Sequence, residues 1–181
     1  MSNKKIPNEY LDLLDINKVL KDTKDVENLK VTLKHNNMKG AGLYATKNIC
    51  AGETIAYYQI KAFDYRHYVS PTNYVYAFDI YTLTGNESKN LIGDIDLNSF
   101  PEPLNNIPFW AAFVNEPSIG EKLNSEINLN VDENYKNKKR IRSGNTLIYK
   151  LVATCNISHG DEITLYYGKD YPRMYEIDVA N

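Results

Sequence analysis

Gly160-Asp-Glu-Ile-Thr-Leu-Tyr-Tyr-Gly-Lys-Asp-Tyr171 combines a turn, a strand pattern and three tyrosines in one short stretch. Ile163 and Leu165 alternate with polar or aromatic neighbours at the period of a strand, and a glycine follows the tyrosine pair. Tyr166 and Tyr167 are therefore predicted to point to opposite faces. A tyrosine hydroxyl at the end of such a strand is a candidate catalytic or ligand-aligning group. The alternative is an aromatic strand in a β core, because tyrosine is favoured in strands.

Three further segments accompany this stretch. Lys39-Gly-Ala-Gly-Leu-Tyr-Ala45 supplies a Gly-x-Gly pair near the front, and Tyr76-Ala-Phe78 is a short aromatic strand pattern. Phe113-Val-Asn-Glu-Pro-Ser-Ile-Gly-Glu-Lys-Leu-Asn124 is a polar loop that follows an apolar run and has an Asn near each end. In this order and spacing, the segments resemble the signature of the SET-domain protein lysine methyltransferase family. The resemblance covers roughly residues 30 to 172.

The resemblance implies a cofactor and a set of site residues. The cofactor is S-adenosyl-L-methionine, and Tyr167 takes the place of the family's active-site tyrosine. The implied cofactor-binding residues are Lys39, Gly40, Ala41, Gly42, Asn115, Glu116 and Tyr167. The implied substrate channel consists of Tyr76, Leu165 and Tyr166. No metal site is expected, because the three histidines lie far apart in different sequence contexts.

Four positions depart from the family pattern. Glu116 stands where His is usual, and Ala112 replaces a common Arg. Leu123 replaces the Pro before Asn124, and Tyr166 replaces a common Asp. These departures keep a second hypothesis open, in which the chain is a non-catalytic SET-like protein-interaction module. The glycine pair, the first Asn of the loop and the tyrosine strand favour the enzyme.

Length and composition predict one domain without a membrane span. The chain has 181 residues, of which 43% are hydrophobic and 24% charged, with a formal net charge of -2. This charge does not favour non-specific binding to nucleic acid or anionic lipid, and no apolar run approaches the roughly 20 residues that span a bilayer. The two cysteines, Cys50 and Cys155, exclude a disulfide framework and a four-cysteine zinc site. We therefore expect a soluble intracellular protein, with the nucleus as one candidate compartment.

The expected fold is mainly β: a SET-domain fold of several short twisted antiparallel sheets, with few helices and a knot-like C-terminal crossing. It is the compact type of the family without flanking zinc clusters, for which a virus is one candidate source. We predict an N-terminal helical extension over residues 1–28 and a SET domain over 29–172, with an insert at about 59–106. A short C-terminal tail follows over 173–181.

Local patterns place the expected elements. Residues 7–22 have the apolar spacing of an amphipathic helix. A glycine-rich turn is predicted at 35–42. Alternating patterns predict strands at 29–33, 43–46, 127–131 and 147–153, the last two as a hairpin. In addition, the segment 45–55 is echoed by 153–163, which fits a fold assembled from similar strand-turn-strand units.

The resemblance implies that the insert forms one wall of a substrate groove. The acidic residues considered for this wall are Asp79, Asp94, Asp96 and Glu102. They either make this wall acidic, which suits a Lys- or Arg-rich peptide such as a histone tail, or are ordinary solvated turn residues. The basic cluster at 136–142 is expected to be a solvated hairpin tip. The expected partner is therefore a basic protein or peptide substrate, without direct nucleic-acid or membrane binding, and a homodimer is one candidate assembly.

Leu165 bears on the number of methyl groups added. The family commonly has Phe or Tyr two residues before the active-site tyrosine, and an aromatic hydroxyl there limits the product to fewer methyl groups. Leucine cannot hold a water by a hydrogen bond. The enzyme is therefore predicted to proceed past monomethylation, unless another channel tyrosine such as Tyr76 imposes the same limit. The alternative is that Leu165 is a plain core residue.

Overall fold

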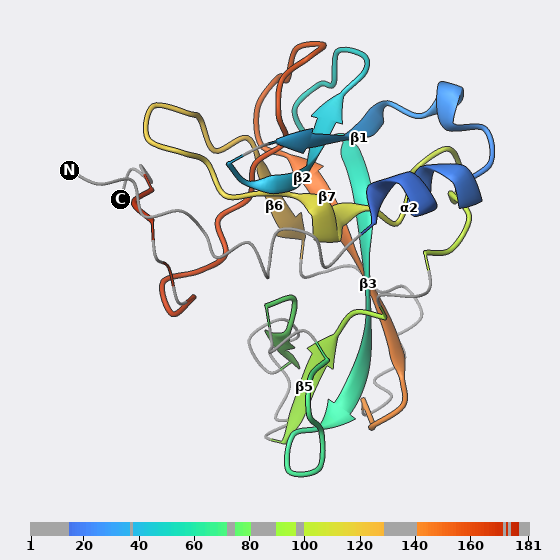
Figure 1. The fold of residues 1–181 in the computed structure, drawn as a ribbon, viewed down its shortest axis with the longest axis vertical. Coiled ribbons are helices and arrows are strands. Elements are labelled where there is room, and N and C mark those ends of the chain that lie inside the picture. Colours follow the sequence, from blue (N-terminus) through green and yellow to red (C-terminus); the bar gives the residue numbers. More distant parts are fainter. Residues whose placement is uncertain are drawn as a thin grey trace.

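The protein is mainly β, as the sequence predicts. The structure is a computed structural model that describes residues 15–36, 38–71, 75–80, 90–96, 100–128, 141–171, 173 and 175–177. Within this part the chain forms two antiparallel sheets and one α-helix (Figure 1). The helices are α2 (Ile16–Asp22) and the 3-10 helices η1 (Val26–Asn28) and η2 (Ala111–Phe113). The strands are β1 (Val31–Asn36), β2 (Gly40–Ala45), β3 (Thr54–Asp64), β4 (Phe78–Asp79), β5 (Leu91–Asp94), β6 (Ser125–Asn128) and β7 (Thr146–Ala153).

β3 is the central strand of the larger sheet, whose strand order is β4-β5-β3-β7-β6. It is 11 residues long and rich in β-branched and aromatic residues, which favour extended structure. Figure 1 shows β3 running along most of the molecule, from the region of β1 and β2 down to β5. Residues 55–58 are buried without interruption, which requires packing on both faces of the sheet. β3 continues through Gln59, the residue at which the insert is predicted to begin. The predicted domain limits stay predictions.

The smaller sheet is the antiparallel pair β1 and β2. The predicted strand at 43–46 corresponds to the second half of β2, and the strand predicted at 29–33 starts too early because its first residue still caps η1. The predicted turn at 35–42 is too long. Asn36 already pairs with Gly40, so the glycine pair lies in β2 and not in the turn.

Gly42 lies where β2 comes closest to the C-terminal part of the chain. A Cβ atom added at Gly42 would lie 2.9 Å from Oε1 of Glu162 and 3.0 Å from Nδ2 of Asn115. A ring carbon of Tyr44 would lie 3.0 Å away. These distances are shorter than van der Waals contact, so the close approach of the strand depends on glycine.

The described part of the predicted N-terminal helix starts later than predicted. α2 starts at Ile16 because Asp15 has an extended backbone, and its carboxylate accepts hydrogen bonds from the N–H groups of Asn17 and Lys18. This is the geometry of an N-cap, which ends any helix that arrives from the other side. A continuous helix over 7–22 is therefore wrong at Asp15, and residues 7–14 lie outside the described residues. α2 buries Val19 against the core beside β1.

The predicted hairpin near the C-terminal end is confirmed. β6 pairs with β7 in antiparallel register, from Ser125 opposite Ala153 to Asn128 opposite Lys150. Strand β6 ends at Asn128, and residues 129–140 lie outside the described residues. Most of the basic cluster at 136–142 falls in that part, so its expected position at a hairpin tip stays a prediction.

The two segments of the sequence echo pair with each other. Ile49 and Ile157 occupy equivalent places in the echo and exchange both backbone hydrogen bonds, each at 2.9 Å. The flanking bonds repeat this symmetry: Gly160 donates to Ala45, and Gly52 donates to Ala153, both at 2.8 Å. The repeated sequence therefore forms a local two-fold pairing that connects the front of the chain to the segment before Tyr167.

The C-terminal segment lies between the two ends of one loop. On one side the N–H of Leu165 donates to the carbonyl of Asn115 at 2.9 Å. On the other side the N–H of Ser125 donates to the carbonyl of Thr164 at 3.1 Å. The side chain of Asn124 adds two bonds, to Glu162 O and from Thr164 N, each at 2.8 Å. The two ends of the 115–125 loop thus enclose the segment between them.

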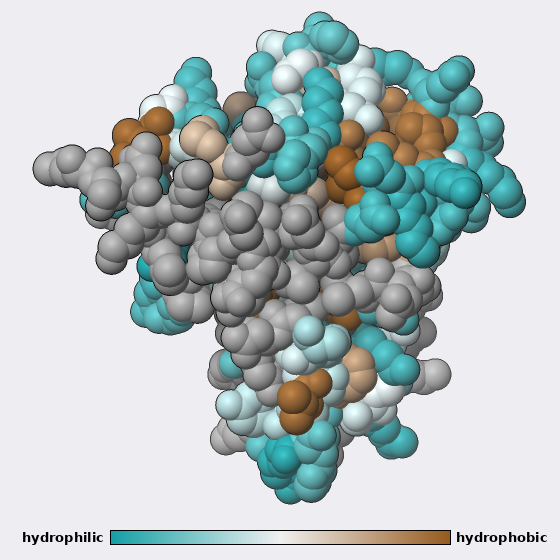
Figure 2. Space-filling view, in the orientation of Figure 1, coloured by the Kyte–Doolittle hydropathy of each residue, from teal (hydrophilic) through white to brown (hydrophobic). Residues whose placement is uncertain are grey.

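The surface of the described part is largely hydrophilic on the face in Figure 2, where apolar residues form small separate patches. The largest fully buried side chains are aromatic, Trp110 and Phe113, and both come from the region of η2. Within the described residues, no helix is long and apolar enough to cross a membrane.

Gly93 offers a test of the packing between β3 and β5. A Cβ atom at this buried position would lie 2.2 Å from Cδ1 of Ile60, whose side chain is only 1% exposed and cannot move aside freely. We expect Gly93→Ala to destabilise the protein by about 1 to 3 kcal/mol, as overpacking does. Chemical denaturation measures this, with exposed Ser143→Ala as the control, and an unchanged midpoint for Gly93→Ala would contradict the packing described.

Candidate active site

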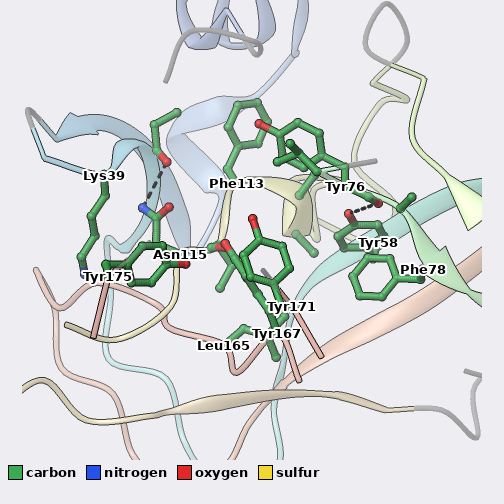
Figure 3. Close-up of a pocket in the computed structure, with 16 residues that line it drawn as sticks. Lys39, Tyr58, Tyr76, Phe78, Phe113, Asn115, Leu165, Tyr167, Tyr171 and Tyr175 are labelled. Carbon is green, nitrogen blue, oxygen red and sulfur yellow. Dashed lines mark hydrogen bonds between the residues drawn. The ribbon is translucent and has the colours of Figure 1, made fainter. Parts of the chain in front are cut away.

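A cavity of about 160 Å³ lies where β2, η2 and the C-terminal segment meet. A cavity of this size admits a ligand group and not only a single water molecule. Sixteen of the residues that the structure describes line the cavity, and aromatic rings dominate this part of its wall (Figure 3). The aromatic lining residues are Tyr58, Tyr76, Phe78, Phe113, Tyr167, Tyr171 and Tyr175.

Tyr167 is fixed at the centre of this wall by two hydrogen bonds. Its hydroxyl donates to the carbonyl of Val114 at 2.5 Å, and its backbone N–H donates to Oε1 of Glu116 at 2.7 Å. Burial holds the pKa of the phenol well above its usual value, and the nearby Tyr175 and Tyr171 raise this pKa further. Tyr167 is therefore neutral at physiological pH. Its proton is engaged with the protein, and its oxygen remains able to accept.

Tyr166 points the other way, as the strand period predicts. It is 36% exposed, and the guanidinium of Arg173 lies 5.1 Å from the centre of its ring. Tyr166 does not line the cavity. The alternation of faces is confirmed, and the structure separates Tyr166 from the other residues of the implied channel.

Asn115 connects the sequence segments that surround the cavity. Its Nδ2 donates to the carbonyl of Ala41 in β2 at 3.1 Å and to Oε1 of Glu162 at 2.9 Å. Both amide hydrogens are therefore engaged, and the orientation of the side chain is fixed. Among the described residues, Oδ1 of Asn115 has no hydrogen-bond partner. It is an acceptor at the cavity wall that a ligand can use.

Lys39 is the only charged residue among the described residues that line the cavity. Its ammonium contacts the carboxylate of Glu121 and lies 3.2 Å from Oε2 of Glu162. The side chain is only 10% exposed, so this small network is partly desolvated. Because Glu162 also accepts from Asn115, the network couples Lys39 to the same part of the wall.

Glu116 lies beneath the wall and is 4% exposed. Its carboxylate accepts from Nε and Nη2 of Arg173 at 2.8 and 2.6 Å and from the hydroxyl of Tyr175 at 2.9 Å. A buried carboxylate requires such a partner because its desolvation is costly. The departure from the usual His is therefore matched by a cation from the end of the chain.

The fold around this cavity is similar to known ones, although no protein-family model and no curated protein matches the chain. A candidate histone methyltransferase of Plasmodium falciparum has a TM-score of 0.50 and 14% identity, covering 79% of this chain and 96% of that chain. The chain has a SET-like fold. The methyltransferase domain of human PR domain-containing protein 2 has a TM-score of 0.42 and 17% identity, covering 96% and 92%. At these identities the likeness concerns the fold alone.

In this SET-like fold, the predicted site residues divide into two groups. Those that line the cavity are Lys39, Ala41, Tyr76, Asn115, Leu165 and Tyr167. Those that lie beside it without lining it are Gly40, Gly42, Glu116 and Tyr166. Figure 3 shows Lys39, Asn115 and Tyr175 toward one side of the cavity and Tyr58, Tyr76 and Phe78 toward the other, with Tyr167 between them. The individual roles of these residues stay predictions.

Sequence reasoning missed the contribution of the C-terminal residues. Tyr171, from the predicted domain, and Tyr175 line the cavity. Arg173 neutralises Glu116, although residues 173–181 are predicted to be a short tail. A signal for Arg173 was present: an acid in place of the usual His needs a cation, and this is the one arginine after Tyr167. No comparable signal pointed to Tyr175, because its position depends on the hydrogen bond to Glu116.

One of the four acidic residues considered for the wall of the groove is buried. Asp94 has no exposed surface, and its carboxylate accepts from the hydroxyls of Tyr68 and Ser70 at 2.7 and 2.5 Å and from Ile95 N at 2.8 Å. It holds the chain around β5 and cannot contact a peptide. Asp79 and Asp96 are exposed.

The titration of Tyr76 gives a test of the cavity. Burial raises the pKa of Tyr76 to about 12, so between pH 10 and 12 the unfolded chain loses this proton while the folded chain keeps it. Stability is therefore lost as the pH rises through this window. We expect Tyr76→Phe to lose about 2 kcal/mol less than the wild type between about pH 9 and pH 12. Urea denaturation at each pH measures this; exposed Tyr65→Phe is the control, and equal losses in all three proteins would contradict the burial of Tyr76.

Proposed function

We propose that this chain is an S-adenosylmethionine-dependent methyltransferase that acts on a lysine side chain of a protein substrate. The observation that carries the proposal is the meeting of three distant sequence segments at one aromatic cavity. Ala41 comes from β2, Asn115 follows η2, and Tyr167 ends the enclosed C-terminal segment. These are the segments on which the family resemblance rests, and the SET-like fold supports the same interpretation.

The lining of the cavity offers contacts that suit the cofactor. S-adenosylmethionine supplies, when bound, a methyl group on a positively charged sulfonium. Aromatic faces attract cations, and the wall offers several of them. Oδ1 of Asn115 is an acceptor in the same wall, and the glycine at position 42 lets the backbone of β2 approach closely. We therefore assign Ala41 and Asn115 to holding the cofactor, with Lys39 as the nearest charged group.

The aromatic wall also suits the second reactant. A free lysine has a pKa of about 10.4, so the neutral amine needed for bond formation costs roughly 4 kcal/mol near neutral pH. Desolvation among aromatic rings lowers the pKa of a buried amine by up to about 3 to 5 units. A separate general base is then unnecessary. Tyr167 is unsuited to that role because it is neutral and its proton is bonded to Val114.

The role that remains for Tyr167 is alignment. Its hydroxyl oxygen is held in a fixed place by the bond to Val114, and it can accept a contact from the amine or from a polarised C–H group. Such a fixed acceptor favours one arrangement of the reacting atoms. We propose a lysine in a basic peptide as substrate, with a histone tail as the first candidate, because the formal net charge of -2 makes a basic partner easier to accommodate.

Tyr167→Phe tests the function and the tyrosine together. We expect the wild type to bind S-adenosylmethionine in calorimetry and to methylate a histone mixture. The variant should still bind the cofactor, while its single-turnover rate falls at least about tenfold, or 1.4 kcal/mol. Loss of the bond to Val114 should cost about 1 kcal/mol of stability.

The control for this experiment is Tyr65→Phe, which removes an exposed hydroxyl just after the end of β3, on a residue that does not line the cavity. A folded wild type that shows no binding at millimolar cofactor would overturn the enzyme proposal and favour the non-catalytic module. A Tyr167→Phe variant that turns over at the wild-type rate would instead make Tyr167 a structural residue.

Leu165 supports a prediction about the product. It lines the cavity close to Tyr167, and it is an apolar side chain that cannot hold a water (Figure 3). We expect the wild type to add more than one methyl group, and Leu165→Tyr to shift the product toward monomethyl-lysine. Mass spectrometry of a substrate peptide over a long time course with excess cofactor decides this. A wild-type product that stops at one methyl group would assign the limit to another residue, with Tyr76 the first candidate.

A further inference from the structure

The buried ion pair of Glu116 and Arg173 is unused by the chemistry proposed above, yet it touches the site from below. The two carboxylate oxygens of Glu116 accept hydrogen bonds from four donors. Oε1 accepts from Tyr167 N and from Nη2 of Arg173, and Oε2 accepts from Nε of Arg173 and from the hydroxyl of Tyr175. One side chain therefore joins the backbone of the central tyrosine to two residues of the C-terminal end.

We propose that Glu116 is a positioning residue for Tyr167, and that Arg173 is the counter-ion without which this positioning fails. The pair also holds Tyr171 and Tyr175 in place at the cavity. The link to methyl transfer rests on the function proposed above, whereas the positioning itself is a property of the fold.

The geometry requires an arginine and not merely a positive charge. Nη1 donates to the carbonyl of Tyr171 at 3.1 Å, and Nη2 donates to the carbonyl of Gly168 at 2.5 Å. The same guanidinium thus binds Glu116 with two nitrogens and fixes the backbone directly after Tyr167. A planar fork can do this, and the point charge of a lysine cannot.

The ring contacts of Arg173 act in the same direction. Its guanidinium lies 5.1 Å from the ring centre of Tyr166 and 5.5 Å from that of Tyr171. The ring of Tyr171 in turn meets that of Tyr167 at 4.8 Å in an edge-on arrangement. Movement of the guanidinium therefore disturbs a cavity-lining ring as well as the carboxylate.

Burial makes the two partners depend on each other. The side chain of Glu116 is 1% exposed and that of Arg173 is 14% exposed. Removing one partner leaves the other as an uncompensated charge away from water, which strongly disfavours the closed arrangement. Without Arg173, the carboxylate draws in water, and Tyr171 and Tyr175 lose the contacts that hold them at the cavity.

Arg173→Lys is the decisive variant, because it keeps the charge and removes the fork. Hydrogen exchange of the full chain without cofactor is followed in the peptide that carries Tyr167 and in a peptide from β3. We expect exchange at Tyr167 to rise at least about tenfold while exchange in β3 is unchanged. S-adenosylmethionine affinity and turnover should each fall at least about tenfold. Arg66→Lys, which alters the exposed pair with Asp64, is the matched control and should change none of these.

A second variant keeps the test valid if Arg173→Lys unfolds. Glu116→Gln/Arg173→Gln leaves no unpaired buried charge, so it should fold, and exchange at Tyr167 should still exceed the wild-type level by about tenfold. If the variant that folds exchanges at Tyr167 at the wild-type rate, the proposal is overturned. The ion pair would then serve only to balance the buried charge. If the wild type binds no S-adenosylmethionine while the variants still loosen Tyr167, the positioning stands and the proposed function fails.

Discussion

The site depends on the enclosure of the C-terminal segment by the 115–125 loop. Backbone hydrogen bonds on both sides, from Leu165 to Asn115 and from Ser125 to Thr164, fix the register of this segment against the loop. The side chain of Asn124 closes the same enclosure from within the loop. In this register, the hydroxyl of Tyr167 donates to the carbonyl of Val114 just before the loop. A cavity with defined dimensions follows from this single constraint.

The second general feature is that the buried carboxylate of Glu116 stays out of the cavity lining, where Lys39 is the only charged residue of the described part of the chain. The described lining consists mostly of aromatic and small apolar residues, whereas the buried carboxylate of Glu116 lies behind it and is neutralised there. An unpaired carboxylate in the wall would attract any cation without regard to geometry. With the charge compensated, the rings, the phenol oxygen of Tyr167 and the amide of Asn115 decide which group fits. This arrangement favours alignment over simple electrostatic attraction.

The sequence echo shows how local similarity supports this design. Two strand-turn-strand units of similar sequence meet at the pair Ile49 and Ile157, with matching bonds on either side. The pairing brings the region of β2, which carries Ala41, against the segment that leads to Tyr167. The sequence revealed the similarity of the two units. It could not reveal that they pair with each other, because a repeat specifies a local conformation and no partner.

The sequence by itself determined the features that depend on local periodicity and on residue type. The alternation around Tyr166 and Tyr167 set their opposite faces, and the mainly β class followed from short alternating patterns. Tertiary structure alone decided the rest. The N-cap at Asp15 depends on the backbone conformation of a single residue, and Asp94 is buried because hydroxyls from another segment surround it. Arg173 and Tyr175 reach the site only because the enclosed segment turns the chain end back onto Glu116, a long-range contact that no local pattern encodes.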